Sequence, residues 1–154
     1  MMLSFAPSAW AVSLNLGDIL VADAGRQAVI AINSSTGAQS LITSGNLLQQ
    51  AVGVGFMASG EIVVADRING LIRVNPVTGA QSVLSSFVNS DTFAVAVDAS
   101  GYIWVADSGY DVSTGRAGIN YAGRIFKVDP ATGKQYLIAQ GDQCTVRSAP
   151  LPKP

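Results

Sequence analysis

The chain has 154 residues, which is enough for one domain with a hydrophobic core of its own. Nine Lys and Arg residues nearly balance ten Asp and Glu residues, so the net charge of −1 favours neither nucleic acid nor an anionic membrane as a partner. The chain contains no histidine, which excludes a Ser-His-Asp triad, a histidine base and a histidine-ligated zinc.

Residues 1–9 are predicted to be a lead-in, and residues 10–16 the first strand of the first repeat. Residues 9–11 (Ala-Trp-Ala) resemble a signal cleavage site, but no basic residue stands near the start and Pro7 interrupts the apolar run. The alternative interpretation, a signal remnant, favours a secreted or periplasmic location over a cytoplasmic one. The uncharged stretch 27–60 is interrupted by Asn, Ser, Thr and Gln, so no membrane span is predicted.

One phrase, Gly-x-Ile-x-Val-Ala-Asp, recurs as GDILVADAG (17–25), GEIVVADRI (60–68) and GYIWVADSG (101–109). Its three aspartates, Asp23, Asp66 and Asp107, are 43 and then 41 residues apart, a period that indicates stacked modular repeats. A second phrase follows each time: INSSTGAQSLI, VNPVTGAQSVL and VDPATGKQYLI. We therefore predict three repeat units at about 10–46, 47–89 and 90–141.

Each unit is predicted to hold four short strands, because runs of Val, Ile and aromatic residues alternate with turns of Gly, Pro, Asn and Ser. In the third unit the expected strands are 94–98, 102–107, 124–129 and 134–139. The second strand of each unit is a continuous apolar run, which is typical of a strand covered on both faces. Four antiparallel strands in about 42 residues, stacked face to face, make a propeller blade. The predicted fold is all-β: a partial or half β-propeller of three four-stranded antiparallel blades.

The segment FAVAVDASGYIWVADSG (93–109) resembles the NHL-repeat pattern, and GVGFMASGEIVVAD resembles it less closely. Over about residues 10–140 the chain is similar to six-bladed propellers of the NHL-repeat and gluconolactonase/senescence-marker group. The resemblance implies a six-bladed ring, of which three blades are present here. We therefore expect a fragment of a longer propeller, or a homodimer that closes the ring. Residues 142–154 hold Cys144, the only cysteine, and are predicted to be an extended Pro-rich tail.

The recurring aspartates end the second strand of each unit. A carboxylate at such a position can accept hydrogen bonds from the backbone N–H groups of the following turn. One aspartate per unit favours a structural role over a catalytic one, because an active site needs one constellation rather than three.

The third unit has an insertion between its second and third strands. This connection takes sixteen residues, 108–123, where the first unit takes four. Loops on one face of a rigid scaffold commonly carry binding residues. The predicted binding residues are Tyr110, Asp111, Arg116, Asn120 and Tyr121. The alternative is a surface insertion without function, which costs little in loop-closure entropy.

Enzyme functions find less support in the residues. The gluconolactonase resemblance implies a central divalent cation held by Glu, Asn and Asp, but Gly53-Val54 and Ala94-Val95 replace the Asn-Gly pair expected before the first strand. Asp98 and Asp107 remain as candidate metal ligands. We predict a non-catalytic propeller module that acts as a scaffold for a protein, peptide or glycan, without a cofactor. The alternative is a Ca²⁺-dependent gluconolactonase-like hydrolase.

Overall fold

The computed structural model describes residues 14–87, 91–108, 110–111, 116–117 and 123–141. The predicted lead-in 1–9 and the predicted tail 142–154 lie outside these residues. The described part of the chain contains no helix with the length and hydropathy to span a bilayer.

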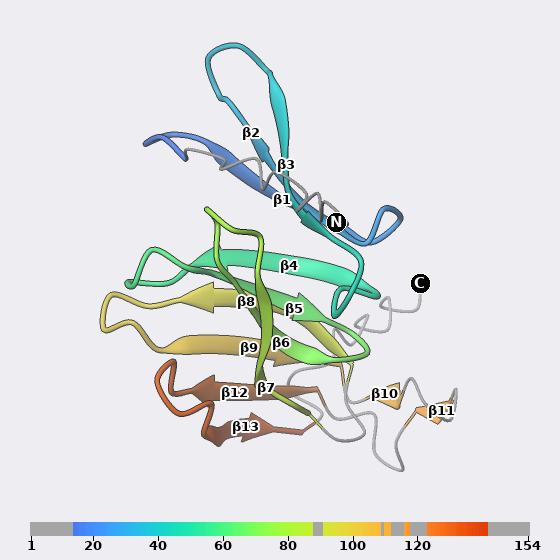
Figure 1. The fold of residues 1–154 in the computed structure, drawn as a ribbon. Helices are drawn as coiled ribbons and strands as arrows, with labels where there is room; N and C mark the ends of the chain where they lie inside the picture. The colour runs from blue at the N-terminus through green and yellow to red at the C-terminus, as the bar shows by residue number, and fades with distance from the viewer. Residues whose placement is uncertain (1–13, 88–90, 109, 112–115, 118–122, 142–154) are drawn as a thin grey trace, which may run out of the picture.

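Three antiparallel sheets follow one another along the chain (Figure 1). The first sheet has the order β1-β2-β3, the second β4-β5-β6-β7 and the third β13-β12-β9-β8. Their strands are β1 Ile19–Asp23, β2 Ala28–Ile32, β3 Gln39–Ser44, β4 Ala51–Phe56, β5 Ile62–Asp66, β6 Gly70–Val74, β7 Gln81–Ser85, β8 Thr92–Val97, β9 Ile103–Asp107, β12 Arg124–Val128 and β13 Gln135–Gln140. The prediction of an all-β partial propeller is confirmed. We call the three sheets the first, middle and third blade.

The strand order of the third blade agrees with the sequence prediction, and each boundary differs from the expected one by no more than two residues. The first blade differs from the prediction. Its described residues form three strands, because residues 10–13 of the expected first strand lie outside the described part and Leu16-Gly17 form a turn.

Two hydrophobic clusters hold the blades together, one at each junction. The cluster between the first and middle blades includes Val29, Leu48 and Ile62, each with no exposed surface. The cluster between the middle and third blades includes Val63, Leu71 and Ile103, which are equally buried. The core therefore consists of blade faces that pack on each other, as the continuous apolar strands predict.

The strand that carries the repeated Val-Ala-Asp phrase is buried to a different extent in each blade. Every residue of β5, in the middle blade, is buried. In β9 buried and half-buried residues alternate, and β1 has no buried residue. The middle sheet is covered on both faces, whereas each end sheet has a neighbouring blade on one face only among the described residues.

The turn between the third and fourth strands is the same in all three blades. Its first residue, Asn33, Asn75 or Asp129, accepts hydrogen bonds from the N–H groups two and three residues further on. Its glycine has a positive φ: 71° at Gly37, 69° at Gly79 and 70° at Gly133. The glycine of the second phrase therefore stands where the turn needs a positive φ.

The insertion of the third blade contains a small ribbon that the sequence did not predict. β10 (Tyr110–Asp111) pairs antiparallel with β11 (Arg116–Ala117), and Tyr110 lies opposite Ala117. Figure 1 shows this ribbon beside the blades, beyond the ends of β9 and β12.

Candidate functional site

The candidate site lies at the end of the blades where the second strand finishes, which we call the insertion end. The described parts of the insertion begin there with Ser108, directly after Asp107 at the end of β9, and finish with Gly123, directly before β12. The connection from the middle blade to the third, which contains Asp91, reaches the same end, because Ser108 N–H donates to the Asp91 carbonyl at 3.0 Å.

Asp66, the repeated aspartate of the middle blade, lies at the insertion end. It has no exposed surface. One of its oxygens accepts the N–H groups of Gln49 and Gln50 at 2.8 and 2.7 Å, and the other accepts those of Ile68 and Asn69 at 3.0 and 2.9 Å. One side chain therefore joins the connection between two blades to the turn that follows β5.

The other two repeated aspartates make different contacts. Asp23 accepts the backbone N–H of Arg26 at 2.9 Å, as the turn-holding prediction requires. Asp107 is buried and accepts hydrogen bonds from Nε and Nη2 of Arg124, at 3.0 and 2.8 Å. Because Arg124 begins β12, this ion pair joins the two strands from which the insertion extends.

A second ion pair crosses the junction between the middle and third blades. Arg67 donates from Nε and Nη2 to the two oxygens of Asp91, with the Nη2 bond at 2.6 Å. Ser108 Oγ donates to the same carboxylate at 3.1 Å. The side chain of Asp91 is 3% exposed and that of Arg67 is 29% exposed, so the carboxylate of this pair is shielded from solvent. The guanidinium of Arg67 also lies 5.2 Å from the ring centroid of Phe93.

Sequence reasoning missed Arg67 and Asp91. They lie in two connections of different blades, 24 residues apart, and neither residue type recurs at the equivalent position of another repeat. One signal could have found them: charges are scarce in this chain, and the two connections that hold these residues are expected at the same end of adjacent blades.

The predicted binding residues all belong to the insertion. The backbone of Tyr110, Asp111 and Arg116 forms the ribbon, and its register places Asp111 opposite Arg116. The side chains of these three residues lie outside the described part of the structure, as do Asn120 and Tyr121 entirely. The described residues at the base of the insertion are held on both sides, Ser108 by Asp91 and Arg124 by Asp107.

The two candidate metal ligands are far apart along the third blade. Asp98 lies in the turn before β9, where it accepts Trp104 Nε1 at 2.8 Å and the N–H groups of Ser100 and Tyr102 at 2.9 and 3.0 Å. The hydrogen bond from the Trp104 indole is the largest influence that lowers the pKa of Asp98, and the two backbone hydrogen bonds lower it further. Asp107 lies at the other end of β9.

These two carboxylates do not fit a shared calcium ion, which needs several oxygen ligands around one point. Among the residues that the structure describes, no three Asp, Glu or Cys side chains come together as a metal site. Glu61, the only glutamate, lies at the end opposite to the insertion end, where its Oε2 is 3.7 Å from Arg73 Nε.

No protein-family model matches the sequence, and no curated protein matches it in sequence. In structure the chain is similar to a gluconolactonase from Xanthomonas campestris, with a TM-score of 0.59 and 15% identity over 76% of this chain and 41% of that chain. It is also similar to a putative gluconolactonase, with a TM-score of 0.54 and 19% identity over 88% of this chain and 54% of that chain. An oligogalacturonate lyase in complex with manganese has a TM-score of 0.52 and 13% identity, over 73% of this chain and 33% of that chain.

These similarities show the fold: the chain has the blade architecture of gluconolactonase-like propellers. The chain spans about half the length of the two gluconolactonases, and less of the lyase. At such low identity the activities named for those proteins do not transfer with the fold.

Proposed function

We propose that this chain is a non-catalytic propeller module that presents a binding surface at its insertion end. The observation that carries the proposal is the use of the buried carboxylates there. Asp66 binds four backbone N–H groups, Asp91 binds Arg67, and Asp107 binds Arg124. Carboxylates bound in this way hold loops in place. Asp91, through Ser108, and Asp107, through Arg124, fix the two ends of the insertion, and Asp66 fixes the neighbouring connections of the middle blade.

A loop with a fixed base suits binding, because less conformational entropy is lost when the ligand docks. In this proposal Tyr110 and Tyr121 are the anchors, Asp111 and Arg116 set the orientation of the ligand, and Asn120 supplies a further hydrogen bond. Tyrosine and arginine are the residue types most enriched at interface hot spots. The ligand is a protein, a peptide or a glycan.

The test replaces residues 108–123 with the connection of the first blade, residues 24–27. That connection already joins two blade strands, β1 and β2, so the shortened protein is expected to keep its far-ultraviolet circular dichroism and its cooperative unfolding. In a quantitative pull-down from the source lysate, the shortened protein should lose partners that the original chain captures. Tyr136→Ala is the matched control, because this tyrosine is 42% exposed and lies on β13, outside the insertion.

Two results would contradict the proposal. The first is a shortened protein that folds and retains every partner. The second is a Tyr136→Ala variant that loses the same partners as Tyr110→Ala, because a general loss of adhesion would then explain both.

A second candidate function is a Ca²⁺-dependent hydrolase of the gluconolactonase kind, with Asp98 and Asp107 as remnants of its ligand set. Two of the similar solved structures are described as gluconolactonases, and this likeness is what favours the candidate. Hydrolysis of gluconolactone that requires Ca²⁺ and is abolished by Asp107→Asn, but not by Asp23→Asn, would support this function over the first.

A further inference from the structure

The two blade junctions share a hydrogen-bonded contact, which we call the blade lock. At the first junction Thr43 Oγ1, on β3, donates to the carbonyl of Gly79 and accepts from Gln81 Nε2, both at 2.8 Å. At the second junction Ser85 Oγ, on β7, donates to the carbonyl of Gly133 and accepts from Gln135 Nε2, also at 2.8 Å. Each lock joins the last strand of one blade to the last turn of the next.

The glycine of each lock is also a point of close packing. A Cβ at Gly79 would lie 2.8 Å from the carbonyl oxygen of Ile42, and a Cβ at Gly133 would lie 2.0 Å from that of Leu84. The first blade has the same turn, with Gly37 at φ 71° and Gln39 two residues later. A Cβ at Gly37 would meet nothing within 4 Å. The first blade therefore carries the glycine and the glutamine of a lock, and among the described residues no other blade contributes the hydroxyl.

The outer face of the first blade matches faces that are buried elsewhere. Ile19 is 53% exposed, whereas the residues at its repeat position, Ile62 and Ile103, have no exposed surface because a blade packs on them. Beside this face lies a groove of about 400 Å³ whose lining includes Gln39, the unfilled lock residue, and Ile30. Ile19 and Gln39 on this face therefore correspond to residues that contact a preceding blade in the other two blades, whereas Ile30 is already buried within the chain.

The outer face of the third blade corresponds to the other face of the middle blade, the one that packs on a following blade. Trp104 and Ile125 occupy the repeat positions of Val63 and Leu71, which are fully buried where the middle blade packs on the next one. On the third blade both side chains are half-buried, and they line a shallow groove of about 170 Å³. This face has the form of one that packs on a following blade.

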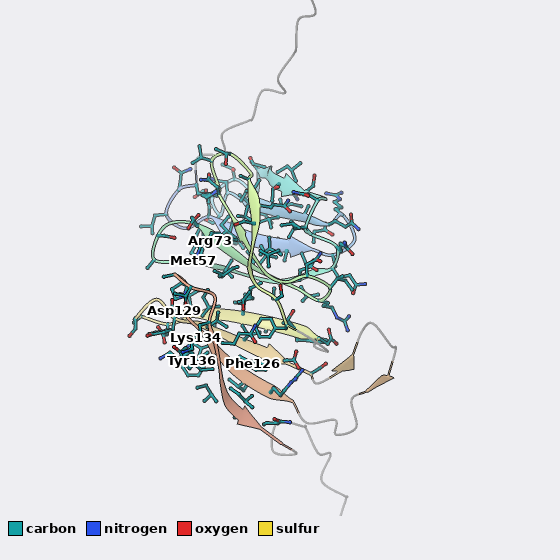
Figure 2. The ribbon with its side chains drawn as sticks, turned by 60° about the horizontal axis from the view of Figure 1, so that its bottom comes forward. Met57, Arg73, Phe126, Asp129, Lys134 and Tyr136 are labelled. Carbon is teal, nitrogen blue, oxygen red and sulfur yellow. The ribbon has the colours of Figure 1, made fainter. Side chains whose placement is uncertain are left out.

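A polar contact also has its equivalent on this face. Arg73, opposite Val63 in the sheet, donates from Nη2 to the carbonyl of Pro130 in the next blade. Figure 2 shows Arg73 at this junction, with Asp129, the neighbour of Pro130, on the facing blade. Lys127 is placed opposite Trp104 as Arg73 is opposite Val63. The residue of the first blade that corresponds to Pro130 is Ser34.

We propose that the outer face of the third blade packs on the outer face of the first blade in a second copy of this chain, reciprocally, so that two copies close one ring. The two faces of one chain are complementary in kind, because each junction within the chain joins the same two kinds of face. One copy covers 41% or 54% of the two gluconolactonases, so two copies supply about one complete propeller. Lys127 of one copy then donates to the Ser34 carbonyl of the other.

One group of the blade lock would be absent at this junction between copies. Restoring it should raise the affinity of the dimer, which makes the proposal testable. The register pairs Val29 with Thr43 and Leu71 with Ser85, and the equivalent pair in the third blade is Ile125 with Ala139. The lock hydroxyl is therefore missing where the third blade would meet Gly37 and Gln39 of the second copy. Ala139→Ser restores it at both junctions of the ring.

The experiment measures the dimer dissociation constant of the full chain by sedimentation velocity over a range of concentrations. Ala139→Ser should lower that dissociation constant at least about fivefold, because the net contribution of one hydrogen bond to the free energy of association is on the order of 1 kcal/mol. Gln39→Ala in the Ala139→Ser background should reduce the gain, because it removes one of the two hydrogen bonds that the new hydroxyl would make. An Ala139→Ser protein with unchanged association, or a gain that Gln39→Ala leaves intact, would overturn the proposal.

Two disruptive variants test the head-to-tail geometry. Ile19→Asp and Ile125→Asp each block one of the two faces, so each alone should sediment as a monomer. A mixture of the two should recover dimers, because one of the two junctions then joins unaltered faces. Val77→Asp is the matched control: Val77 is also 53% exposed, but it belongs to the middle blade, which has a neighbour on both faces.

The remaining outcomes decide against the ring. If the unaltered chain is a monomer at every concentration, no second copy closes it. If only one of the two Asp variants dissociates, the dimer joins two identical faces instead. Species that grow beyond a dimer would show a contact that repeats without closing. None of these measurements involves the insertion, so they are independent of the proposed binding function.

Discussion

Replacing Asp66 with asparagine should destabilise this protein far more than the same change at Asp23. The asparagine side chain keeps one acceptor oxygen, whereas its NH2 group cannot accept the two N–H groups that the lost oxygen held. Two of the four bound N–H groups, either those of Gln49 and Gln50 or those of Ile68 and Asn69, are then left without an acceptor.

A donor left unsatisfied at a buried site costs about 1–3 kcal/mol, so two of them predict a loss of about 2–6 kcal/mol in the free energy of unfolding. Asp23 has one such hydrogen bond, from Arg26, and its side chain is 29% exposed. An asparagine oxygen can still accept that bond. Asp23→Asn should therefore cost no more than about 1 kcal/mol.

The measurement is urea denaturation followed by circular dichroism, at one fixed protein concentration because association shifts the apparent stability. An unchanged m-value together with a lower midpoint would attribute the loss to the folded state. The reasoning is refuted if Asp66→Asn costs less than about 1 kcal/mol, or no more than Asp23→Asn.

Three further predictions follow from the turns and from Asp98. Gly133→Ala should unfold the protein or lower its free energy of unfolding by more than about 3 kcal/mol, because the new Cβ would lie 2.0 Å from a backbone carbonyl oxygen. Gly37→Ala should cost only the left-handed backbone strain of about 1 kcal/mol. Equal losses of stability for the two variants in denaturation would contradict this prediction. The lowered pKa of Asp98 predicts stability that is complete above the ordinary value of 3.8 and is lost as the pH falls through the folded-state pKa. Trp104→Phe should raise the pKa of Asp98 and reduce this acid-sensitive contribution; a carboxyl titration by NMR that is unchanged in the variant would contradict it. Millimolar Ca²⁺ should leave the melting temperature unchanged, since a bound ion at a hundredfold excess over Kd would add about 2.7 kcal/mol; an upward shift that Asp98→Asn abolishes would favour the hydrolase.

The strands and turns of this fold are predictable because they depend on local sequence. The turn from Asp129 to Gly133 needs an Asx side chain at its start and a positive φ at its end, and the sequence displays both. The unbroken apolar run of β5 likewise predicts a strand, whereas its complete burial, which β1 does not share, depends on a neighbouring blade on each face. The period of the repeat then places equivalent strands in consecutive sheets.

The contacts of the candidate site are less predictable because they join distant parts of the chain. The structural role expected for Asp66 holds, but its bonds to Gln49 and Gln50 depend on where the preceding connection lies. The pair of Arg67 and Asp91 depends on two connections that meet at one end of adjacent blades. Neither of these contacts is encoded by a sequence motif, so the repeat pattern and the composition alone do not identify the partners.

The burial of β5 on both faces also governs how this chain opens. The two hydrophobic clusters join the middle blade to the first blade and to the third, so the stability of the described part of the chain is approximately a sum of blade and junction terms. In a monomer of this chain, a blade at either end can then detach after breaking one junction, whereas the middle blade opens only when both are lost. Amide hydrogens of β5 should consequently exchange with solvent most slowly, and protection should decline toward β1 and β13 as the outer blades unfold independently.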